Sequence, residues 1–576
     1  MNVLGINCLA HDTAAALVVD GQVVAFVEEE RLSREKHTWA FPDRAIRWCL
    51  ETGGLAVNEI DLVTFDYRPG LDYARGMAYD ILPHLPRSAK HWAKQTYVDG
   101  RHVWKARDFR RRWGYRGRIR FIEHHRTHAA AAFLSSPFDR AVALSIDRGG
   151  DYLSTAAYLC EGTQMREIAR VRNPHSLGEL YSAVTWWLGF KPNYDEGKVM
   201  GLASYGRPTY LDDFRSMVRC RPDGEFRINL SWAGWHTEHG NAWVSERFQK
   251  RFGPPRRADE PITEFHEDVA FGLQAVVEEA ALNLAREAAI QCGRGIGLCL
   301  GGGVALNSVM NARLLTDGPF RDLFIPAPCG DAGNAIGGAL LAWHEETGKP
   351  RGWQMEHAYL GPEFSAAAIR RALDERKLTY REVADPPVEA ARLLAAGRIT
   401  GWFQGRTEAG PRALGNRSIL ADPRPHHMKD TINAEVKHRE PFRPFAPSVL
   451  AEEAPAWFEP VAPSPFMLLC LPIRPERRAQ VPAVTHVDGT GRLQTVTEAA
   501  NPPFRRLIET FHRETGVPMV LNTSFNDVGE PIVCSPVEAV RTYFSTGLDA
   551  LVIGPYVLEK REKKEKEEKR QTSRPR

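Results

Sequence analysis

The chain has 576 residues, of which 75 are lysine or arginine and 72 are aspartate or glutamate, and its formal net charge is +3. This length predicts two or three domains, and the near-neutral charge argues against a protein whose whole surface binds nucleic acid. No apolar run approaches ~20 residues, so no membrane-spanning helix is predicted. The nine cysteines form no CxxC pair and the first residues carry no basic leader, so we expect a reduced, cytoplasmic protein.

The first residues predict a strand, a polar turn and a hairpin. Residues 3–6, 14–19 and 23–27 are rich in apolar β-formers, and an Asp-Gly pair between the last two is a strong hairpin signal. The turn between the first two strands contains His11, which is either an ordinary turn residue or part of a site. A strand, a polar turn and a second strand also begin actin-like nucleotide-binding folds.

Three charged or amphipathic stretches follow. Residues 28–37, EEERLSREKH, favour an ordinary charged loop, and residues 39–62 predict an amphipathic helix leading into a strand at 61–65. Residues 101–120 contain nine lysine or arginine residues, one acid and several aromatic residues. Such a segment either holds RNA or an anionic ligand, or forms a helix with packed aromatics and solvent-facing arginines. The pattern favours the helix.

The sequence FIEHHRTHAAAAF predicts the end of a strand followed by a helix. His124 and His128 are four residues apart and share one face of this helix, whereas His125 does not. A histidine pair at this spacing binds a divalent metal or is structural, and the spacing alone does not decide. Asp147, at the end of a later predicted strand, can supply a carboxylate oxygen to the same ion.

A second glycine-rich region follows a long amphipathic helix predicted over residues 263–293. Gly301, Gly302 and Gly303 end a strand and precede a helix, which lets a nucleotide phosphate approach the backbone. The segment is neither a Rossmann fingerprint nor a P-loop. Asp331 lies at a later strand-to-helix junction, where it is a second candidate metal ligand or a helix cap.

After a linker predicted at 346–362, residues 404–447 interleave cations with glycines and apolar residues. Guanidinium groups on such turns bind two oxygens of one anion, so the segment predicts an oxyanion site, with a solvated loop as the alternative. Further on, the strand VLNTSFN places Asn522, Ser524 and Asn526 on one face, where they orient a small amide or a ribose or serve as ordinary turn residues. The eight cations are Arg406, Arg412, Arg417, Arg424, Lys429, Lys437, Arg439 and Arg443.

Nine segments resemble the NodU/CmcH family of O-carbamoyltransferases, which includes enzymes that carbamoylate nodulation factors and antibiotics. Each segment is weak alone, but nine in one order are specific, and the likeness covers nearly the whole chain before the tail. In chain order they are AHDTAAALVVDG, EEERLSREKH, EHHRTHAAAA, EGKVMGLASYG, GGGVALN, CGDAGNAIGGA, EAGPRALGNRSILADPR, VKHREPFRPFAPSV and LNTSFN.

The resemblance implies an α/β protein with two domains. Residues 1–355 are expected to form an actin-like (ASKHA) domain, related to the transferase that makes threonylcarbamoyl-adenosine on tRNA. Residues 356–558 are expected to form a YrdC-like α/β domain. Residues 559–576 lack apolar side chains and are expected to be a charged, disordered tail.

The resemblance also implies an ATP-dependent carbamoyl transfer in two steps. In the YrdC-like domain, carbamoyl phosphate and ATP form carbamoyl-adenylate. In the actin-like domain, the carbamoyl group passes to a hydroxyl of a small acceptor beside a divalent metal. Fe²⁺ is expected at that centre, and Mg²⁺ is expected with ATP.

Matching positions carry over the family's site residues. The carbamoyl phosphate site implies Arg412, Lys437, Arg443, Arg492 and Asn522, with Ser524 as the serine of the carbamoyl site. The transfer centre implies His11 and Lys36 as catalytic residues, and His124, His128, Asp147 and Asp331 as metal ligands. The nucleotide site implies Gly301, Gly302, Gly303, Asn307 and Asp331. The segment DRGGD that begins at Asp147 differs from the DGxGE commonly found in the family.

Two other functions remain open. A threonylcarbamoyl transferase would hold tRNA with residues 101–120, and an actin-type ATPase would carry out no group transfer. Activation and transfer motifs occur together in one chain, which favours the small-molecule carbamoyltransferase, and the near-neutral charge disfavours the RNA enzyme. The identity of the acceptor and the oligomeric state are not predicted.

Overall fold

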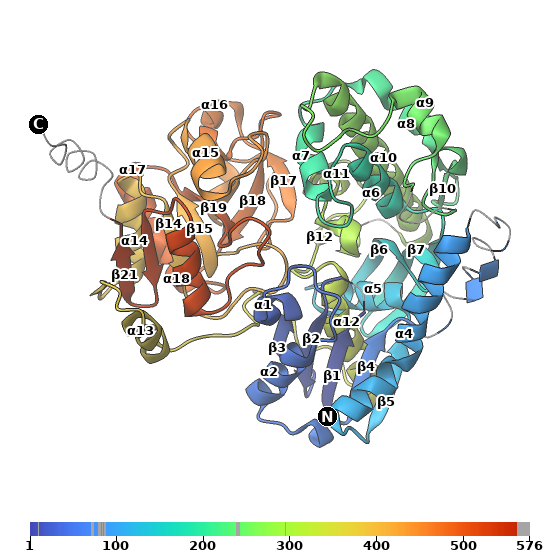
Figure 1. Cartoon of the computed structure of the whole chain (residues 1–576), viewed down its shortest axis with the longest axis horizontal. Helices are drawn as coiled ribbons and strands as arrows, with labels where there is room; N and C mark the ends of the chain where they lie inside the picture. Colours follow the sequence, from blue (N-terminus) through green and yellow to red (C-terminus); the bar gives the residue numbers. More distant parts are fainter. Residues whose placement is uncertain are drawn as a thin grey trace, which may run out of the picture.

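The computed structural model describes residues 1–560 except 10, 69, 71–73, 76, 79–81, 83–84, 86–87, 238–241 and 294, so nearly all of the expected tail lies outside the described residues. The described chain is a mixed α/β structure built on three large sheets (Figure 1). Two five-stranded sheets belong to its N-terminal part and a nine-stranded sheet to its C-terminal part. Among the described residues, no helix is both long and apolar enough to cross a bilayer.

The two five-stranded sheets have the same topology. In the first sheet, order β3-β2-β1-β4-β5, three antiparallel strands are extended by two parallel ones. The second sheet, order β8-β7-β6-β11-β12, repeats this arrangement, although the sequence shows no repeat. The strands are β1 (Asn2–Asn7), β2 (Ala14–Val19), β3 (Gln22–Glu28), β4 (Leu62–Asp66), β5 (Arg118–Ile122), β6 (Arg140–Gly150), β7 (Leu153–Glu161), β8 (Gln164–Arg172), β11 (Gly297–Gly301) and β12 (Leu323–Phe324).

Two helices lie between these sheets. Helix α12 (Asn334–Thr347) packs on strands of the first sheet, and α5 (His124–Leu134) packs on β6 and β11 of the second. The helices also pack against each other, closely enough that a Cβ at Gly337 would lie 2.1 Å from the backbone oxygen of Thr127. Glycine is therefore required at this crossing, which joins the two sheets.

The remaining elements of the N-terminal part surround the sheets (Figure 1). Helix α10 (Glu264–Cys292) agrees with the helix predicted at 263–293, but the helix predicted at 39–62 is only α2 (Asp43–Gly53). It ends early because Gly54 adopts a left-handed cap with φ of 63°. The other helices and strands are α1 (Glu29–Ser33), α4 (Ala89–Trp113), α6 (Leu177–Trp187), α7 (Glu196–Ala203), α8 (Leu211–Met217), α9 (Glu246–Phe252), α11 (Ser308–Thr316), β9 (Val218–Cys220) and β10 (Phe226–Ile228).

The basic segment 101–120 forms the end of α4 and most of β5. As the helix interpretation requires, Phe109 is buried, but Trp104 is 53% exposed. The arginines of this segment are exposed or half-exposed, as the helix interpretation requires, but Lys105 is fully buried. Its ammonium donates to the backbone oxygen of Asp66 and lies 5.4 Å from the centroid of the Phe65 ring, so a carbonyl and an aromatic face replace its hydration.

The C-terminal part is organised around the nine-stranded sheet, of order β13-β21-β20-β14-β15-β19-β16-β18-β17. Helices α14 and α17 pack against each other and against its strands. The strands are β13 (Arg381–Glu382), β14 (Thr400–Phe403), β15 (Arg417–Ala421), β16 (Ala446–Leu450), β17 (Leu469–Pro472), β18 (Thr490–Val496), β19 (Met519–Ser524), β20 (Ala550–Ile553) and β21 (Tyr556–Glu559). The helices are α13 (Ala366–Asp374), α14 (Pro386–Ala395), α15 (Met428–Thr431), α16 (Pro475–Arg478), α17 (Pro502–Thr515) and α18 (Pro536–Ser545).

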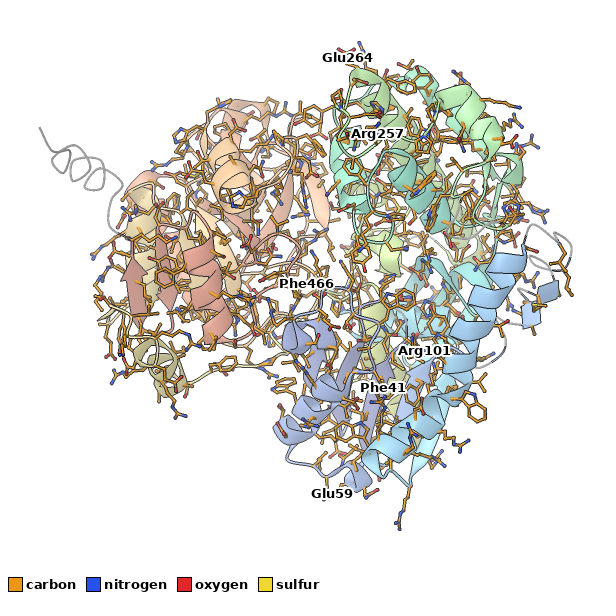
Figure 2. The ribbon with its side chains drawn as sticks, viewed as in Figure 1. Phe41, Glu59, Arg101, Arg257, Glu264 and Phe466 are labelled. Carbon is orange, nitrogen blue, oxygen red and sulfur yellow. The ribbon has the colours of Figure 1, made fainter. Side chains whose placement is uncertain are left out.

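The N-terminal and C-terminal parts share one apolar core. Figure 2 shows Phe466 at the boundary between them, where its ring meets that of Phe324 edge-on with centroids 6.2 Å apart. Nearby, the amide of Asn311 donates a 3.0 Å hydrogen bond to the backbone oxygen of Leu468. The two parts therefore pack intimately, and a site at their boundary can draw residues from both.

Candidate metal centre and cation pocket

Helix α5 presents two histidines one turn apart. Glu123 caps the helix, because its carboxylate accepts from the backbone N–H groups of His125 and Arg126. His124 and His128 are fully buried and face the same way, whereas His125 is held elsewhere by Ser145 and a backbone oxygen. The helix thus aims one pair of imidazoles at a single point.

Two carboxylates meet these imidazoles, and the four residues form what we call the metal centre: His124, His128, Asp147 and Asp331. Asp147 lies near the end of β6, and Asp331 lies in the turn before α12. The two Nε2 atoms are 3.1 Å apart, His124 Nε2 is 3.2 Å from Asp147 Oδ2, and His128 Nε2 is 3.3 Å from Asp331 Oδ1.

The geometry of these donors fits a divalent metal ion. Ligand atoms about 2.1 Å from an ion lie roughly 3.0–3.4 Å apart in tetrahedral or octahedral coordination. The three closest separations agree with that range, and all four donor atoms lie within 4.8 Å of one another. Two imidazoles with two carboxylates suit first-row transition metals such as iron, manganese or zinc.

The metal centre is also an electrostatic unit. Burial by itself raises the pKa of Asp147, but the hydrogen bond from His124 and the charge of His128 hold that pKa well below its usual range. Burial lowers the pKa of His124, but hydrogen bonds to Asp147 and Asp66 raise it well above its usual range. The imidazole of His124 therefore favours its protonated form, and a metal ion must displace that proton.

Glycines and backbone groups hold the metal centre in place. Gly303 donates its N–H to Asp147 Oδ1 over 2.8 Å, and Asp151 accepts the N–H of His124 over 2.8 Å. Gly150 lies against the His124 ring, where a Cβ would be 2.3 Å from Cδ2. The glycines at the ends of β6 and β11 therefore allow a close approach that larger residues would block.

A second cluster, which we call the cation pocket, lies in the C-terminal part. Lys437 follows a π-helical turn at Ile432–Val436 and is 6% exposed. Its ammonium donates to the backbone oxygen of Ser524 over 2.6 Å and to Asn526 Oδ1 over 2.6 Å. Burial, followed by the charges of Arg439 and Arg443, holds the pKa of Lys437 well below its usual range.

Two guanidinium groups of the cation pocket have no carboxylate partner in the part of the chain that the structure describes. The Nε atoms of Arg412 and Arg492 are buried with no hydrogen-bond partner among the described residues. Burial and the neighbouring charge of Arg412 hold the pKa of Arg492 well below its usual range. Arg439 stacks on Phe445 with its carbon centre 4.5 Å from the ring. Arg443 lies 3.8 Å from a carboxylate oxygen of Glu440, whereas Arg412 and Arg492 form no ion pair among the described residues. Positive charge therefore gathers around these two guanidinium groups, and such a site suits an oxyanion. The cation pocket comprises Arg412, Lys437, Arg439, Arg443, Arg492 and Ser524.

Family models match most of the chain. The model described as "Carbamoyltransferase N-terminus" matches residues 2–340, and that described as "Carbamoyltransferase C-terminus" matches residues 391–560. The chain belongs to the carbamoyltransferase family. The carbamoyltransferase has both N-terminal and C-terminal family regions, and the expected resemblance to NodU/CmcH enzymes is confirmed.

Similar proteins support this assignment. Nodulation protein NolNO of Sinorhizobium fredii is 39% identical over 96% of this chain and 80% of its own length. Uncharacterized protein sll1178 of Synechocystis is 39% identical over 97% of both chains, and nodulation protein U of Bradyrhizobium diazoefficiens is 28% identical over 91% and 92%. Component A of the Acidaminococcus fermentans (R)-2-hydroxyglutaryl-CoA dehydratase is 14% identical and covers 61% of this chain and 100% of its own, but its TM-score of 0.34 is too low to argue for a shared fold.

Three of the predicted site residues of the carbamoyltransferase form hydrogen bonds within the protein. Asn307 pairs with Gln274 through two side-chain hydrogen bonds and caps α11 through the N–H of Met310. Gly303 donates its N–H to Asp147, one of the four residues of the candidate metal centre. Asn522 is fully buried, where its amide donates to Ser448 over 3.0 Å. These three residues support the architecture around the two sites.

His11 and Lys36 lie on the loops that lead into and out of the first hairpin. His11 Nδ1 is 3.1 Å from Asp12 Oδ2, and its ring stands 6.4 Å from that of Trp39. Lys36 is exposed, and the charges of Glu30, Arg31 and Arg443 act on its ammonium. Lys36 is thus electrostatically linked to the cation pocket of the other part.

Sequence reasoning missed several residues that build the sites of this carbamoyltransferase. The stretch EEERLSREKH favoured a charged loop, but its residues Glu29–Ser33 form α1, and Arg31 within that helix is 2% exposed. Asp66, which lies 3.4 Å from His124 Nδ1, ends an apolar strand and was not singled out. The motif resemblance around Arg31 was the available signal, because charge spacing alone does not distinguish a buried ion pair from a solvated one.

Proposed function

We propose that the chain is an ATP-dependent O-carbamoyltransferase that forms carbamoyl-adenylate at the cation pocket and passes the carbamoyl group to a small hydroxylated acceptor near the metal centre. The observation that carries this proposal is the pair of buried guanidinium groups of Arg412 and Arg492, whose Nε atoms have no hydrogen-bond partner among the described residues. The charge of Arg443 acts on both Arg492 and the buried ammonium of Lys437. These groups match phosphate-bearing substrates such as carbamoyl phosphate and ATP.

The first step is an activation. Water cleaves carbamoyl phosphate to carbamate and phosphate, and a carbamate oxygen attacks the α-phosphorus of ATP and expels pyrophosphate. Arg412, Arg443 and Arg492 bind the phosphate oxygens, and Lys437 stabilises the charge that develops on them. Fixed cations of this kind typically contribute about 10²–10³-fold each. Ser524, which Lys437 contacts, binds the carbamoyl unit.

The second step is a transfer. His11 takes the proton of the acceptor hydroxyl, and Lys36 orients the adenylate phosphate. His124, His128, Asp147 and Asp331 would hold Fe²⁺, which would supply a Lewis acid for the carbamoyl oxygen. Gly301–Gly303, beside that centre, leave room for the nucleotide, with Mg²⁺ accompanying ATP. A labile adenylate needs shielding from water, which favours a closed path between the two sites.

The domain assignment is part of the same proposal. The duplicated five-stranded sheets with α5 and α12 between them support an actin-like domain over residues 1–355. Residues 356–558, with the nine-stranded sheet, form the YrdC-like domain. All nine cysteines are free thiols, which fits a cytoplasmic location. Nodulation proteins among the relatives favour an acceptor made in biosynthesis of a small molecule.

A second candidate is a threonylcarbamoyl-type transferase acting on tRNA. The observation that favours it is the exposed basic and aromatic face of α4, where Trp104 and Arg107 stack. Tight binding of tRNA that weakens steeply with salt, and a threonylcarbamoyl mass gain on tRNA, would favour this candidate.

One assay separates the two. The protein loaded with Fe²⁺ is incubated with ATP and carbamoyl phosphate without an acceptor, and pyrophosphate and carbamoyl-adenylate are measured. We expect both products, with omission of carbamoyl phosphate as the control. Folded protein that releases no pyrophosphate would refute the proposal. A screen of hydroxylated small molecules for a carbamoyl mass gain then identifies the acceptor.

A further inference from the structure

A carboxylate bridges two imidazoles beside the first hairpin. Asp12 Oδ2 lies 3.1 Å from His11 Nδ1, and Asp12 Oδ1 lies 2.6 Å from His37 Nδ1. Because a carboxylate accepts, both imidazoles donate their Nδ1–H to Asp12. The Nε2 atom of His11 has no hydrogen-bond partner among the described residues, and the side chain is 25% exposed. His11 is thus fixed at one nitrogen and free at the other.

The backbone on both sides of the bridge is strained. Asp12 has φ of 61° and His37 has φ of 54°, in the left-handed region that most residues avoid. The amide of Asn7 donates to the backbone oxygen of Asp12, and Glu30 Oε2 accepts the N–H of His37 over 2.9 Å. Such conformations persist where the surrounding structure fixes them, and they concentrate at functional sites.

From this geometry we propose that Asp12 is the positioning residue of His11 and that His37 holds Asp12 in place, so that His11 presents Nε2 to the acceptor hydroxyl. The proposal rests on the transfer role assigned to His11 above. Asp12 and His37 are not catalytic residues in this scheme, because neither touches the reacting atoms. We call His11 and His37, together with the Asp12 carboxylate that bridges them, the bridged pair.

The chemistry assigned to the bridged pair is one proton transfer. As the acceptor oxygen attacks the carbamoyl carbon, its proton passes to Nε2 of His11. The bond from that carbon to the phosphate oxygen breaks, and AMP leaves with the electron pair. Asp12 fixes the Nδ1–H tautomer and stabilises the imidazolium that forms, as carboxylates do for histidine bases in other enzymes.

The charges around His11 agree with this arrangement. Burial lowers the pKa of His11, and the charge of Arg148 lowers it slightly. The hydrogen bond and charge of Asp12, with a smaller contribution from Asp331, outweigh these effects and raise that pKa to about 9. His37 acts on the same carboxylate from the far side. Since the base is the neutral imidazole, the transfer rate is expected to rise with pH towards that value.

The test uses substitutions that keep the left-handed backbone. Asparagine tolerates this region as well as aspartate does, so Asp12→Asn removes the charge without adding strain. His37→Asn keeps a donor facing Asp12. Asp20→Asn is the matched control, because Asp20 has φ of 48° on an exposed turn outside the site.

The first measurement needs no acceptor. Hydrogen–deuterium exchange at the imidazole C2 atom, followed by mass spectrometry over a pH series, reports the pKa of His11 in the full-length protein. We expect the midpoint to fall by more than one pH unit in Asp12→Asn, and to stay within a few tenths of a unit in His37→Asn and Asp20→Asn. An unchanged midpoint in Asp12→Asn overturns the proposal.

The second measurement follows transfer of the carbamoyl group to glycerol, with the adenylate formed in place from ATP and carbamoyl phosphate. Asp12→Asn is expected to lower transfer by about 10²-fold or more while adenylate formation stays within about twofold, since general-base steps contribute about 10²–10⁴-fold. Equal loss of both steps would refute a positioning role. If His11→Ala leaves transfer intact, the catalytic assignment of His11 fails, and the exchange midpoints still decide whether Asp12 positions it.

Discussion

Arg31 donates a 2.6 Å hydrogen bond to the backbone oxygen of Gly410, 379 residues further along the chain. Gly410 in turn donates its N–H to Glu28 Oε1 over 2.6 Å. Arg31 also pairs with the buried carboxylate of Glu30. Since Gly410 precedes Arg412 by two residues, this contact fixes the loop that carries one of the unpaired guanidinium groups. The N-terminal part thereby shapes the cation pocket of the C-terminal part.

Removal of Arg31 is expected to loosen the boundary. Arg31→Met leaves the buried carboxylates of Glu28 and Glu30 without their cation, and breaking a buried pair typically costs about 3–5 kcal/mol. We expect a loss of about 3 kcal/mol in the free energy of unfolding by denaturant titration. The control is Arg257→Ala, whose partner Asp259 is as exposed as Arg257 itself and whose loss should cost less than about 1 kcal/mol. Figure 2 labels Arg257. Equal stability of the two variants would contradict a stabilising buried ion pair between Arg31 and its carboxylates.

Lys437 is expected to be needed for activation alone. Lys437→Ala removes the ammonium between Ser524 and Asn526, so pyrophosphate release should fall by about 10²-fold or more. Metal content, measured by elemental analysis, should not change, and Lys250→Ala on the surface serves as the control. Wild-type activation should also fall as pH rises through the lowered pKa of Lys437, because the neutral amine cannot stabilise phosphate charge. Full activation by Lys437→Ala would remove this residue from the proposed site.

His128 is expected to be needed for metal binding and transfer alone. His128→Ala leaves three of the four donors, so we expect at least about a tenfold weaker affinity for Fe²⁺ or Co²⁺ in titrations, as ligand-shell changes of this kind produce. Pyrophosphate release should persist, because the cation pocket is intact. His426→Ala, at an exposed position, is the control. Loss of activation in His128→Ala would mean that the two half-reactions are not divided between the two sites.

Gly150 offers a steric test of the metal centre. Gly150→Ala places a methyl group 2.3 Å from Cδ2 of His124, so the ring must shift from its position in the metal centre. We expect weaker metal binding, with a change in the visible spectrum of the Co²⁺-loaded protein. Gly197→Ala is the matched control, because nothing lies within 4 Å of its added methyl group. Identical Co²⁺ spectra and affinities for both variants would show that the His124 ring does not need this space.

Metal affinity is expected to depend on pH in a defined direction. The pKa of His124 is raised well above its usual range, since Asp147 and Asp66 outweigh the effect of burial. A metal ion binds the neutral ring, so below that pKa it must displace a proton, and affinity falls as pH decreases. Calorimetric titrations in buffers of different ionisation enthalpy should therefore detect proton release. Binding without proton release at neutral pH would contradict the protonated ion pair.

The local pattern of the sequence predicted the histidine pair but not its surroundings. The spacing of His124 and His128 fixes their common face wherever the segment is helical, and the alanine run favours a helix. The helix at 263–293 was likewise predictable, because its apolar period continues over many turns. The position of Asp331 against these rings depends on the packing of α12 on α5, which no local period encodes.

Contacts between distant segments account for what sequence reasoning missed. Asp12 and His37 lie on separate loops, and nothing in their spacing indicates a 2.6 Å contact. Lysine on a helix usually faces solvent, yet tertiary packing buries Lys105 beside Phe65. The sequence shows no repeat that would predict the duplicated strand order, because the hydrogen-bond pattern of a sheet does not require particular residues.

The duplicated sheets give the metal centre a mechanical meaning. The two histidines belong to α5, which packs on the second sheet, and Asp331 leads into α12, which packs on the first. An ion bound by both histidines and Asp331 would link α5 to α12. Sliding of one sheet over the other would then have to break a coordinate bond.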